Sequence, residues 1–179
     1  MKRATVGDLA TTSADVLVIG GGIYGLMVAR DAALRGLRTV LVERDDWGGG
    51  TSHNSLKIMH GGIRYVQHLD IRRLRASARE QAFWQRAAPD LIQPLDFVIP
   101  LFGHGVKGPA AFAAAAAIYA TASMGVRGPD YGGASVVGPA EAARRMGELA
   151  PEGLSGGGVW RDGQIVDANR LHLACLGGA

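Results

Sequence analysis

The chain has 179 residues, of which 47% are apolar and 20% are charged, and its formal net charge is +3. This composition is typical of a globular domain with its own core and excludes collagen-like and largely disordered chains. Without a long basic tract, the mild charge gives no reason to expect a nucleic-acid partner. The single cysteine, Cys175, excludes an internal disulfide, and no run of about 18 apolar residues predicts a membrane-spanning helix.

A βαβ unit is predicted after a polar leader that lacks the apolar run of a secretory signal. The aliphatic run DVLVIG, residues 15–20, predicts a buried parallel strand, and residues 23–36 predict a helix. A second aliphatic run, LRTVLVERD at residues 37–45, predicts another buried strand. Strand, glycine turn, helix and strand within about thirty residues form a βαβ unit, so the predicted fold class is α/β.

The remaining elements alternate with Gly- and Pro-rich punctuation. Residues 51–67 are predicted to be irregular at first. Helices are predicted over residues 69–88, 110–123, 139–149 and 168–176, and a strand over residues 95–102. The pair Asp162–Gly163 predicts a hairpin or tight turn, and Asp167 is expected to cap the last helix.

A glycine pattern, G-x-G-x-x-G, lies directly between the first strand and the first helix of this unit. Its glycines permit a sharp turn, the approach of a pyrophosphate to the backbone and close packing of the helix, whose N-terminal N–H groups face the phosphates. Glu43 can accept hydrogen bonds from ribose hydroxyls and would repel the 2′-phosphate of NADP. A glycine turn without a ligand is the alternative. The predicted nucleotide-binding residues are Gly20, Gly22, Ile23, Tyr24, Gly25, Glu43 and Arg44.

The glycine pattern serves both NAD and FAD, so the next segment has to distinguish them. A typical NAD dehydrogenase continues soon after its second strand to further βα units. Here the polar, glycine-bearing segment TSHNSLKIMHGGIRYVQ, residues 51–67, intervenes. Such a segment can wrap a second, larger half of a cofactor, which favours FAD.

Four segments together resemble the FAD-dependent glycerol-3-phosphate dehydrogenases, within the D-amino-acid-oxidase-like superfamily: DVLVIGGGIYGLMVARDAALRG, VLVERDD, TSHNSLKIMHGGIRYVQ and VWRDGQIVDANRL. The resemblance implies an incomplete Rossmann-like FAD-binding domain followed by the start of a mixed α+β substrate domain. The chain departs from the family at Leu56, where serine is usual, and at His53 and Asn54, which replace small residues. Residues 103–138 have no close match, so the substrate is less certain than the cofactor.

On this resemblance, residues 51–65 form a flavin cradle. Hydroxyls can bond pyrophosphate or ribityl oxygens, a lysine adds positive charge, and two glycines let the backbone approach the flat ring. The further predicted cofactor-binding residues are Thr51, Ser52, Ser55, Lys57, Gly61 and Gly62.

Three residues of the same segment are predicted to act on the substrate, and no metal site is predicted. Arg64 presents a planar fork suited to a phosphate dianion, and the resemblance places Arg64 and Tyr65 in the substrate pocket. His60 is the third catalytic candidate, as a hydrogen-bond partner near the ring. The alternatives are a structural role for His60 and plain loop-surface charge for Lys57 and Arg64.

The predicted division is a polar leader, the N-terminal part of an FAD-binding domain, the start of a substrate domain, and a return helix toward the FAD domain, at residues 1–14, 15–94, 95–165 and 166–179. Family members are far longer. We therefore expect a truncated product, a fragment or one piece of a split protein, whose parallel sheet lacks members and exposes apolar surface.

Three functional hypotheses follow. The first is oxidation of sn-glycerol 3-phosphate to dihydroxyacetone phosphate, with hydride transfer to flavin N5 and electrons passing to a quinone or another acceptor. The second keeps FAD and changes the substrate to an amine or a 2-hydroxy acid. The third is an inactive fragment that binds nucleotide weakly or only pairs with another chain. The resemblance also implies a cytoplasmic protein with peripheral membrane contact, while the oligomeric state stays open.

Overall fold

The computed structural model describes residues 5–177, so the first four residues of the predicted leader and the last two of the return segment lie outside it. The chain forms two compact units: the first unit joins Met1–Lys57 to Ile165–Ala179, and the second unit is Ile58–Gln164. The domain boundaries predicted from the sequence were at 94/95 and 165/166. Residues 58–94 cluster with the second unit because their long helix, α3 (Ile71–Ala87), packs on other elements of that unit.

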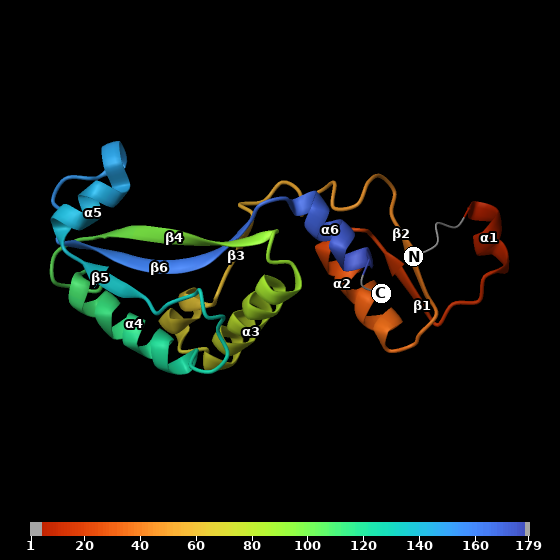
Figure 1. Cartoon of the computed structure of the whole chain (residues 1–179), viewed down its shortest axis with the longest axis horizontal. Coiled ribbons are helices and arrows are strands. Elements are labelled where there is room, and N and C mark those ends of the chain that lie inside the picture. Colours follow the sequence, from red (N-terminus) through yellow and green to blue (C-terminus); the bar gives the residue numbers. More distant parts are fainter. Residues whose placement is uncertain (1–4, 178–179) are drawn as a thin grey trace. The chain divides into compact units, whose positions relative to one another are not determined.

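The first unit is built on a two-stranded parallel sheet. Strands β1 (Val16–Ile19) and β2 (Thr39–Val42) pair in register, with Val16 opposite Thr39. Helix α2 (Ile23–Leu34) packs on both strands, and α6 (Ala168–Gly177) lies beside α2 (Figure 1). The Rossmann-like βαβ arrangement predicted from the sequence is confirmed.

The burial of β1 differs from the prediction of a strand covered on both faces. Val18 is only 9% exposed, whereas Leu17 is 60% and Ile19 is 81% exposed. Successive side chains of a strand point to opposite faces, and α2 covers one face of this sheet. The buried-strand prediction is therefore wrong for Leu17 and Ile19, and the expected exposed apolar surface is present.

A short helix, α1 (Val6–Thr11), lies in the segment predicted as a polar leader. Its N-terminus is a capping box: the Asp8 N–H donates to the Thr5 hydroxyl, and the Thr5 N–H donates to the Asp8 carboxylate at 2.8 Å. The T-x-x-D spacing in the sequence is the local signal for this helix start.

The second unit holds a four-stranded sheet organised around one strand, β6 (Gly156–Ile165). It pairs antiparallel with β3 (Ile58–Met59) and β5 (Ser135–Val137), and it also pairs with β4 (Ile92–Leu101). The turn predicted from the Asp-Gly signal is therefore wrong, because both residues lie inside β6.

The glycine at that place in β6 has a packing reason. A Cβ on Gly163 would stand 3.0 Å from the Ile92 side chain and 3.1 Å from the Tyr131 hydroxyl. The absence of a side chain thus lets β4 and the Tyr131 loop approach the strand closely. In this strand the Asp-Gly pair therefore permits tight packing and does not form a turn.

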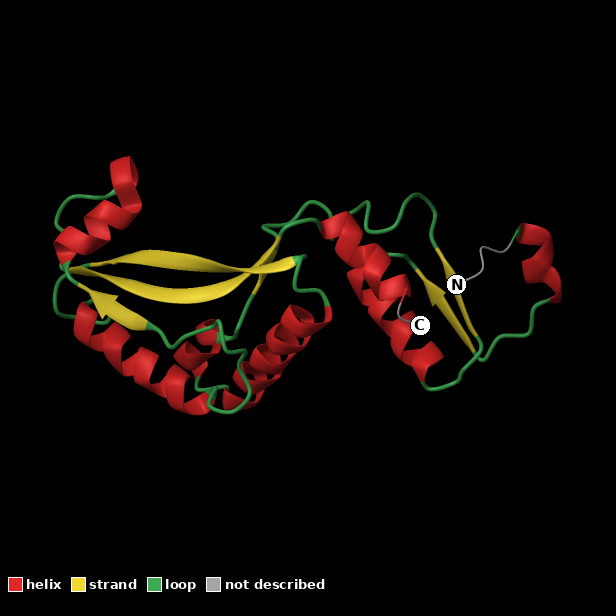
Figure 2. Ribbon diagram, in the orientation of Figure 1, coloured by secondary structure: helices red, strands yellow, loops and turns green. Residues whose placement is uncertain are grey.

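Helices line the sheet of the second unit, with α3 and α4 on the same side of it (Figure 2). The remaining helical elements are η1 (Ile63–His68), α4 (Pro109–Ala122), α5 (Pro139–Met146) and η2 (Gly147–Leu149). Val66, Leu74 and Tyr119 form a buried cluster between η1, α3 and α4. Within residues 5–177, no helix is both long and apolar enough to cross a membrane.

Leu74 tests this core, because its side chain is fully buried. We expect Leu74→Ala to lower the free energy of unfolding by about 2–5 kcal/mol, through lost burial and the cavity left behind. Leu149→Ala is the matched control, since Leu149 is 88% exposed in the same unit. Urea denaturation followed by circular dichroism measures both, and equal losses would contradict the assigned core.

Candidate functional site

In the glycine turn of the first unit, the backbone at Gly20 lies very close to the backbone at Gly25. Gly20 has a φ of +105°, in the region that favours glycine. A Cβ on Gly25 would stand 1.9 Å from the Gly20 carbonyl oxygen, which is backbone and has little freedom to move. The turn therefore requires both glycines in order to start α2 directly at the end of β1.

Two side chains from later segments close the mouth of α2. The Gly21 N–H donates to Glu43 Oε2 at 2.6 Å, and the Ile23 N–H donates to Ser52 Oγ at 2.9 Å. Hydrogen bonds from the N–H groups of Asp45 and Gly21 lower the pKa of Glu43 below its usual value. The structure thus brings three predicted pieces together: the glycine turn, the carboxylate after β2 and the hydroxyl segment.

Trp47, which was not among the predicted site residues, also covers the turn. A Cβ on Gly21 would meet the Trp47 ring at 2.4 Å, so the indole lies directly on the Gly21 backbone. The Gly48 N–H donates to the Gly21 carbonyl at 2.8 Å. The glycine run after Trp47 was the available signal, because a bulky ring can reach a backbone only where neighbours are small.

The same 48–53 segment is held by α6. A Cβ on Gly48 would collide with the His172 ring at 2.0 Å, and His53 Nδ1 lies 3.1 Å from the Asn169 side-chain oxygen. Burial, with His53 nearby, lowers the pKa of His172. Asp167 accepts from the Arg170 N–H at 3.0 Å, so the predicted capping of this helix is confirmed. The C-terminal segment therefore supports the nucleotide side of the first unit.

The other nucleotide-side candidates lie at the surface of the first unit. Tyr24, Arg44, Thr51 and Ser55 are exposed, and Arg44 pairs with its neighbour Asp45 at 3.1 Å. Ser55 Oγ accepts from the Lys57 N–H at 3.2 Å. Lys57 has a φ of +54°, which is uncommon for a residue with a side chain. These positions stay predictions, since no contact among the described residues assigns them a ligand.

A second polar cluster lies in the other unit, around the carboxylate of Asp162. Its side chain is 1% exposed and accepts from His60 Nδ1 at 3.1 Å and from the Gly61 N–H at 2.6 Å. Gln81 and Trp160 donate to the same carboxylate. Asp162 was not among the predicted site residues, because the Asp-Gly pair indicated a hairpin or tight turn rather than a carboxylate inside the sheet.

The glycines of the H-G-G-x-R-Y segment are fixed by packing in the second unit. A Cβ on Gly61 would stand 2.7 Å from the Tyr119 hydroxyl, and one on Gly62 would stand 2.8 Å from the Leu74 carbonyl oxygen. Burial, with the nearby charge of Asp162, raises the pKa of Tyr119 to about 12. These glycines therefore have a structural requirement that is independent of any flavin.

Arg64 and Tyr65 follow on η1 with different exposure. Arg64 is exposed, Tyr65 packs against the Val66–Leu74–Tyr119 cluster, and the guanidinium carbon lies 5.6 Å from the Tyr65 ring centroid. No ion pair joins Arg64 to another residue in the described part of the chain. The aromatic ring supports the planar cation while its donors stay open to a ligand.

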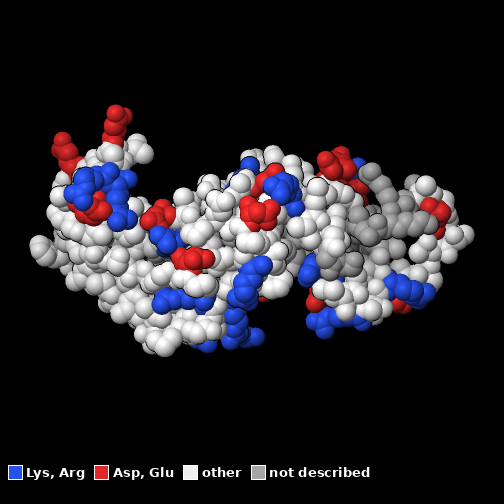
Figure 3. Space-filling view, in the orientation of Figure 1, with Lys and Arg blue, Asp and Glu red and all other residues white. Residues whose placement is uncertain are grey.

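Several charged residues of the second unit form ion pairs. Arg161 lies 2.6 Å from Asp96, which lowers the pKa of that carboxyl, and Arg145 lies 2.6 Å from Glu141. On the face in Figure 3, Lys and Arg are interspersed with Asp and Glu. The basic side chains on this face therefore do not gather into one binding area.

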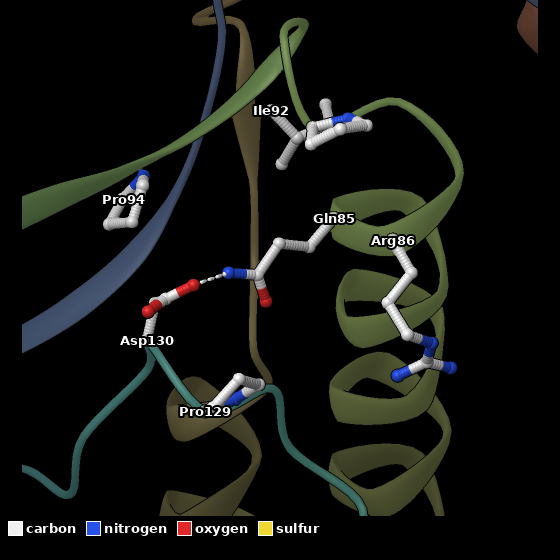
Figure 4. A pocket seen from close by; sticks show the side chains of 7 residues that line it. Gln85, Arg86, Ile92, Pro94, Pro129 and Asp130 are labelled. Atoms are coloured by element: carbon white, nitrogen blue, oxygen red, sulfur yellow. Dashed lines mark hydrogen bonds between the residues drawn. The ribbon is translucent and has the colours of Figure 1, made fainter.

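A hollow of about 290 Å³ in the second unit contains none of the predicted site residues. Figure 4 shows the Gln85 amide bonded to the Asp130 carboxylate across it. Its lining residues are Gln85, Arg86, Pro89, Ile92, Pro94, Pro129 and Asp130. It carries no arrangement of groups suited to flavin or phosphate chemistry.

Comparison with known proteins identifies the family. The FAD-dependent oxidoreductase family matches residues 15–179. The chain belongs to this family. It is 36% identical over 166 residues to a glycerol-3-phosphate dehydrogenase of Synechocystis sp., covering 93% of this chain and 30% of that protein. It is also 50% identical over 86 residues to D-erythritol 1-phosphate dehydrogenase of Brucella abortus, covering 48% of this chain and 17% of that protein.

A solved structure agrees with the sequence relatives. The glycerol-3-phosphate dehydrogenase of Bacillus halodurans, complexed with FAD, superimposes with a TM-score of 0.63 at 26% identity, covering 97% of this chain and 26% of that chain. In sequence, the chain spans only 30% of the length of the Synechocystis relative. The predicted family and its cofactor, FAD, are confirmed.

The first unit of this family member fits a flavin nucleotide. The first turn of α2 begins beside glycines that carry no Cβ, so a diphosphate can approach the backbone and the N-terminal end of the helix, next to the Ser52 hydroxyl. Glu43 lies within hydrogen-bond distance of Gly21, so a ribose acceptor stands next to the phosphate site. The residues that would hold the nucleotide are therefore on one unit and close to one another.

Gly25 gives a direct test of the turn. We expect Gly25→Ala to lower the free energy of unfolding by more than about 2 kcal/mol, because the added methyl overlaps the Gly20 carbonyl. Gly50→Ala is the control, since a Cβ there meets nothing within 4 Å, and its effect should stay within about 0.5 kcal/mol. Chemical denaturation checks both, and a stable Gly25→Ala would refute the close approach.

Proposed function

We propose that the protein oxidises sn-glycerol 3-phosphate to dihydroxyacetone phosphate as an FAD-dependent dehydrogenase. One observation carries the proposal: a single short segment presents an imidazole held by a buried carboxylate and, four residues later, an exposed guanidinium without an ion pair in the described part of the chain. An oriented imidazole suits proton removal from a hydroxyl, and a guanidinium suits a phosphate. The relatives named for phosphorylated polyols support this substrate class.

Each residue of the segment has a distinct task in this proposal. Arg64 binds the substrate phosphate through its planar donors, and the Tyr65 ring keeps the guanidinium in orientation. His60 accepts the proton of the C2 hydroxyl. Bound FAD supplies the two-electron acceptor for the C2 hydrogen, which leaves as hydride. Loss of one proton and one hydride converts the secondary alcohol to the ketone, so the step balances.

A second candidate substrate is a longer phosphorylated polyol. It is favoured by the 50% identity to D-erythritol 1-phosphate dehydrogenase over 86 residues. Such a substrate has the same phosphate for Arg64 and a secondary hydroxyl for His60. An amine or a 2-hydroxy acid is less favoured, because the relatives compared above are named for phosphorylated polyols. Reoxidation by a quinone or another acceptor, at the cytoplasmic membrane face, is part of the proposal and rests on the sequence resemblance.

The substrate is tested by anaerobic flavin bleaching. The full chain, loaded with FAD, is mixed with sn-glycerol 3-phosphate, D-erythritol 1-phosphate, glycine or lactate, and the blue absorbance is followed. We expect bleaching by the phosphorylated polyols only. Bleaching by glycine or lactate alone would replace this proposal with the amine or hydroxy-acid reading, and a chain that binds no FAD would support the inactive fragment.

Arg64 is tested in the same assay. We expect Arg64→Ala to raise the half-saturating concentration of sn-glycerol 3-phosphate by about 10- to 100-fold, because a charged hydrogen bond of about 1.5–3 kcal/mol is lost. Arg79→Ala, an exposed arginine on α3, should leave it unchanged. Equal behaviour of the two variants would remove Arg64 from phosphate binding.

A further inference from the structure

We propose that Asp162 is the positioning residue of this site: it holds His60 in the tautomer protonated on Nδ1, so that Nε2 carries the lone pair that accepts a proton. The inference rests on the proposed role of His60 and deepens it. Asp162 lies 102 residues from His60 in the sequence and is bonded to it through space. It acts through the imidazole, because its own carboxylate is 1% exposed and cannot meet a substrate.

The carboxylate is saturated with donors. Oδ1 accepts from the Gly61 N–H at 2.6 Å and from Gln81 Nε2 at 3.2 Å. Oδ2 accepts from Trp160 Nε1 and from His60 Nδ1, each at 3.1 Å. A buried charge is retained only where it is paired and hydrogen-bonded, so this cage is the condition for a carboxylate inside the sheet.

The tautomer follows from the chemistry of the four partners. A backbone N–H and an indole N–H can only donate, and an ionised carboxylate can only accept. His60 Nδ1 therefore has to carry its proton toward Oδ2. In a neutral imidazole the other nitrogen is then the acceptor, which is the state required for taking a proton from a hydroxyl.

The two residues of the His60–Asp162 pair differ in solvent exposure. The His60 side chain is 49% exposed, whereas the Asp162 side chain is 1% exposed. The carboxylate also holds the N–H of Gly61, the residue after His60, so the ring and its backbone are fixed by one group. A Cβ on Gly61 would stand 2.8 Å from Gln81 Oε1, so a residue with a side chain does not fit at this position.

The cage is rigid because its members come from different elements of the second unit. Trp160 stacks on Phe97 with ring centroids 5.3 Å apart, which fixes the indole donor on β6. Gln81, fully buried on α3, also donates to the Met59 carbonyl at 2.7 Å. Met59 pairs with Gly163 in the sheet, next to Asp162. The position of the imidazole is thus fixed by contacts with one helix and two strands.

Nitrogen-15 NMR of the full chain reads the tautomer without substrate turnover. The His60 signals are identified by their loss in His60→Gln, and the pH is kept high enough for a neutral ring. We expect wild-type His60 to be protonated on Nδ1. A wild-type ring protonated on Nε2 would overturn the proposal, whichever variants fold.

Variants then separate the carboxylate from general packing. We expect Asp162→Asn to lose the Nδ1-protonated signal, and Asp96→Asn, in an ion pair elsewhere on the sheet, to keep it. Trp160→Phe should also keep it, because the aromatic stack and the His60 contact remain, and it supplies a test if Asp162→Asn does not fold. An unchanged His60 signal in folded Asp162→Asn would overturn the proposal, and so would its loss in folded Trp160→Phe.

Turnover provides the second readout. In the FAD-loaded chain, Asp162→Asn should lower kcat with sn-glycerol 3-phosphate by about 100-fold or more, as for loss of general base catalysis. KM should change little, because the phosphate contact at Arg64 is intact. A raised KM with unchanged kcat would contradict a positioning role. A chain that shows the expected tautomer but oxidises no polyol phosphate would refute the proposed function and leave this inference standing.

Discussion

In each unit, one carboxylate accepts the N–H of a glycine that is distant in the sequence, and the candidate residues of that unit depend on this bond. Glu43 accepts from Gly21, and Asp162 accepts from Gly61. Glycine is suited to this contact because a side chain at either position would meet a neighbour, the Trp47 ring or the Tyr119 hydroxyl. A short charged hydrogen bond to backbone fixes a turn more firmly than apolar contact alone, since it constrains direction as well as distance.

The two bonds serve different chemistry. At Gly21 the carboxylate is at the end of β2 and beside a helix mouth, so it orders a place for a nucleotide. At Gly61 the carboxylate is buried in β6, and its effect is transmitted through His60. In the proposed function, the first unit therefore binds the cofactor, while the second supplies the acid–base group and a guanidinium.

Local pattern was sufficient for the βαβ unit, whose strands, glycine turn and helix follow one another along the chain. It was insufficient where partners are remote: Asp162 and His60 are 102 residues apart, and no periodicity links them. Asp162–Gly163 also shows how a turn signal fails, because Gly163 is needed for close packing rather than for reversal. Burial of β1 was overestimated at Leu17 and Ile19 for a related reason, since composition does not show which faces neighbours cover.

The residues of the H-G-G-x-R-Y segment do not carry equal weight for function. Gly61 and Gly62 are explained by the neighbouring Tyr119 hydroxyl and Leu74 backbone, which leave no room for a side chain at either position. His60 and Arg64 have exposed side chains, and each is oriented by one neighbour, Asp162 and the Tyr65 ring. An imidazole and a guanidinium at these two exposed places are not required by the packing that explains the glycines. The proposed catalysis therefore rests on His60 and Arg64 rather than on the glycine pattern between them.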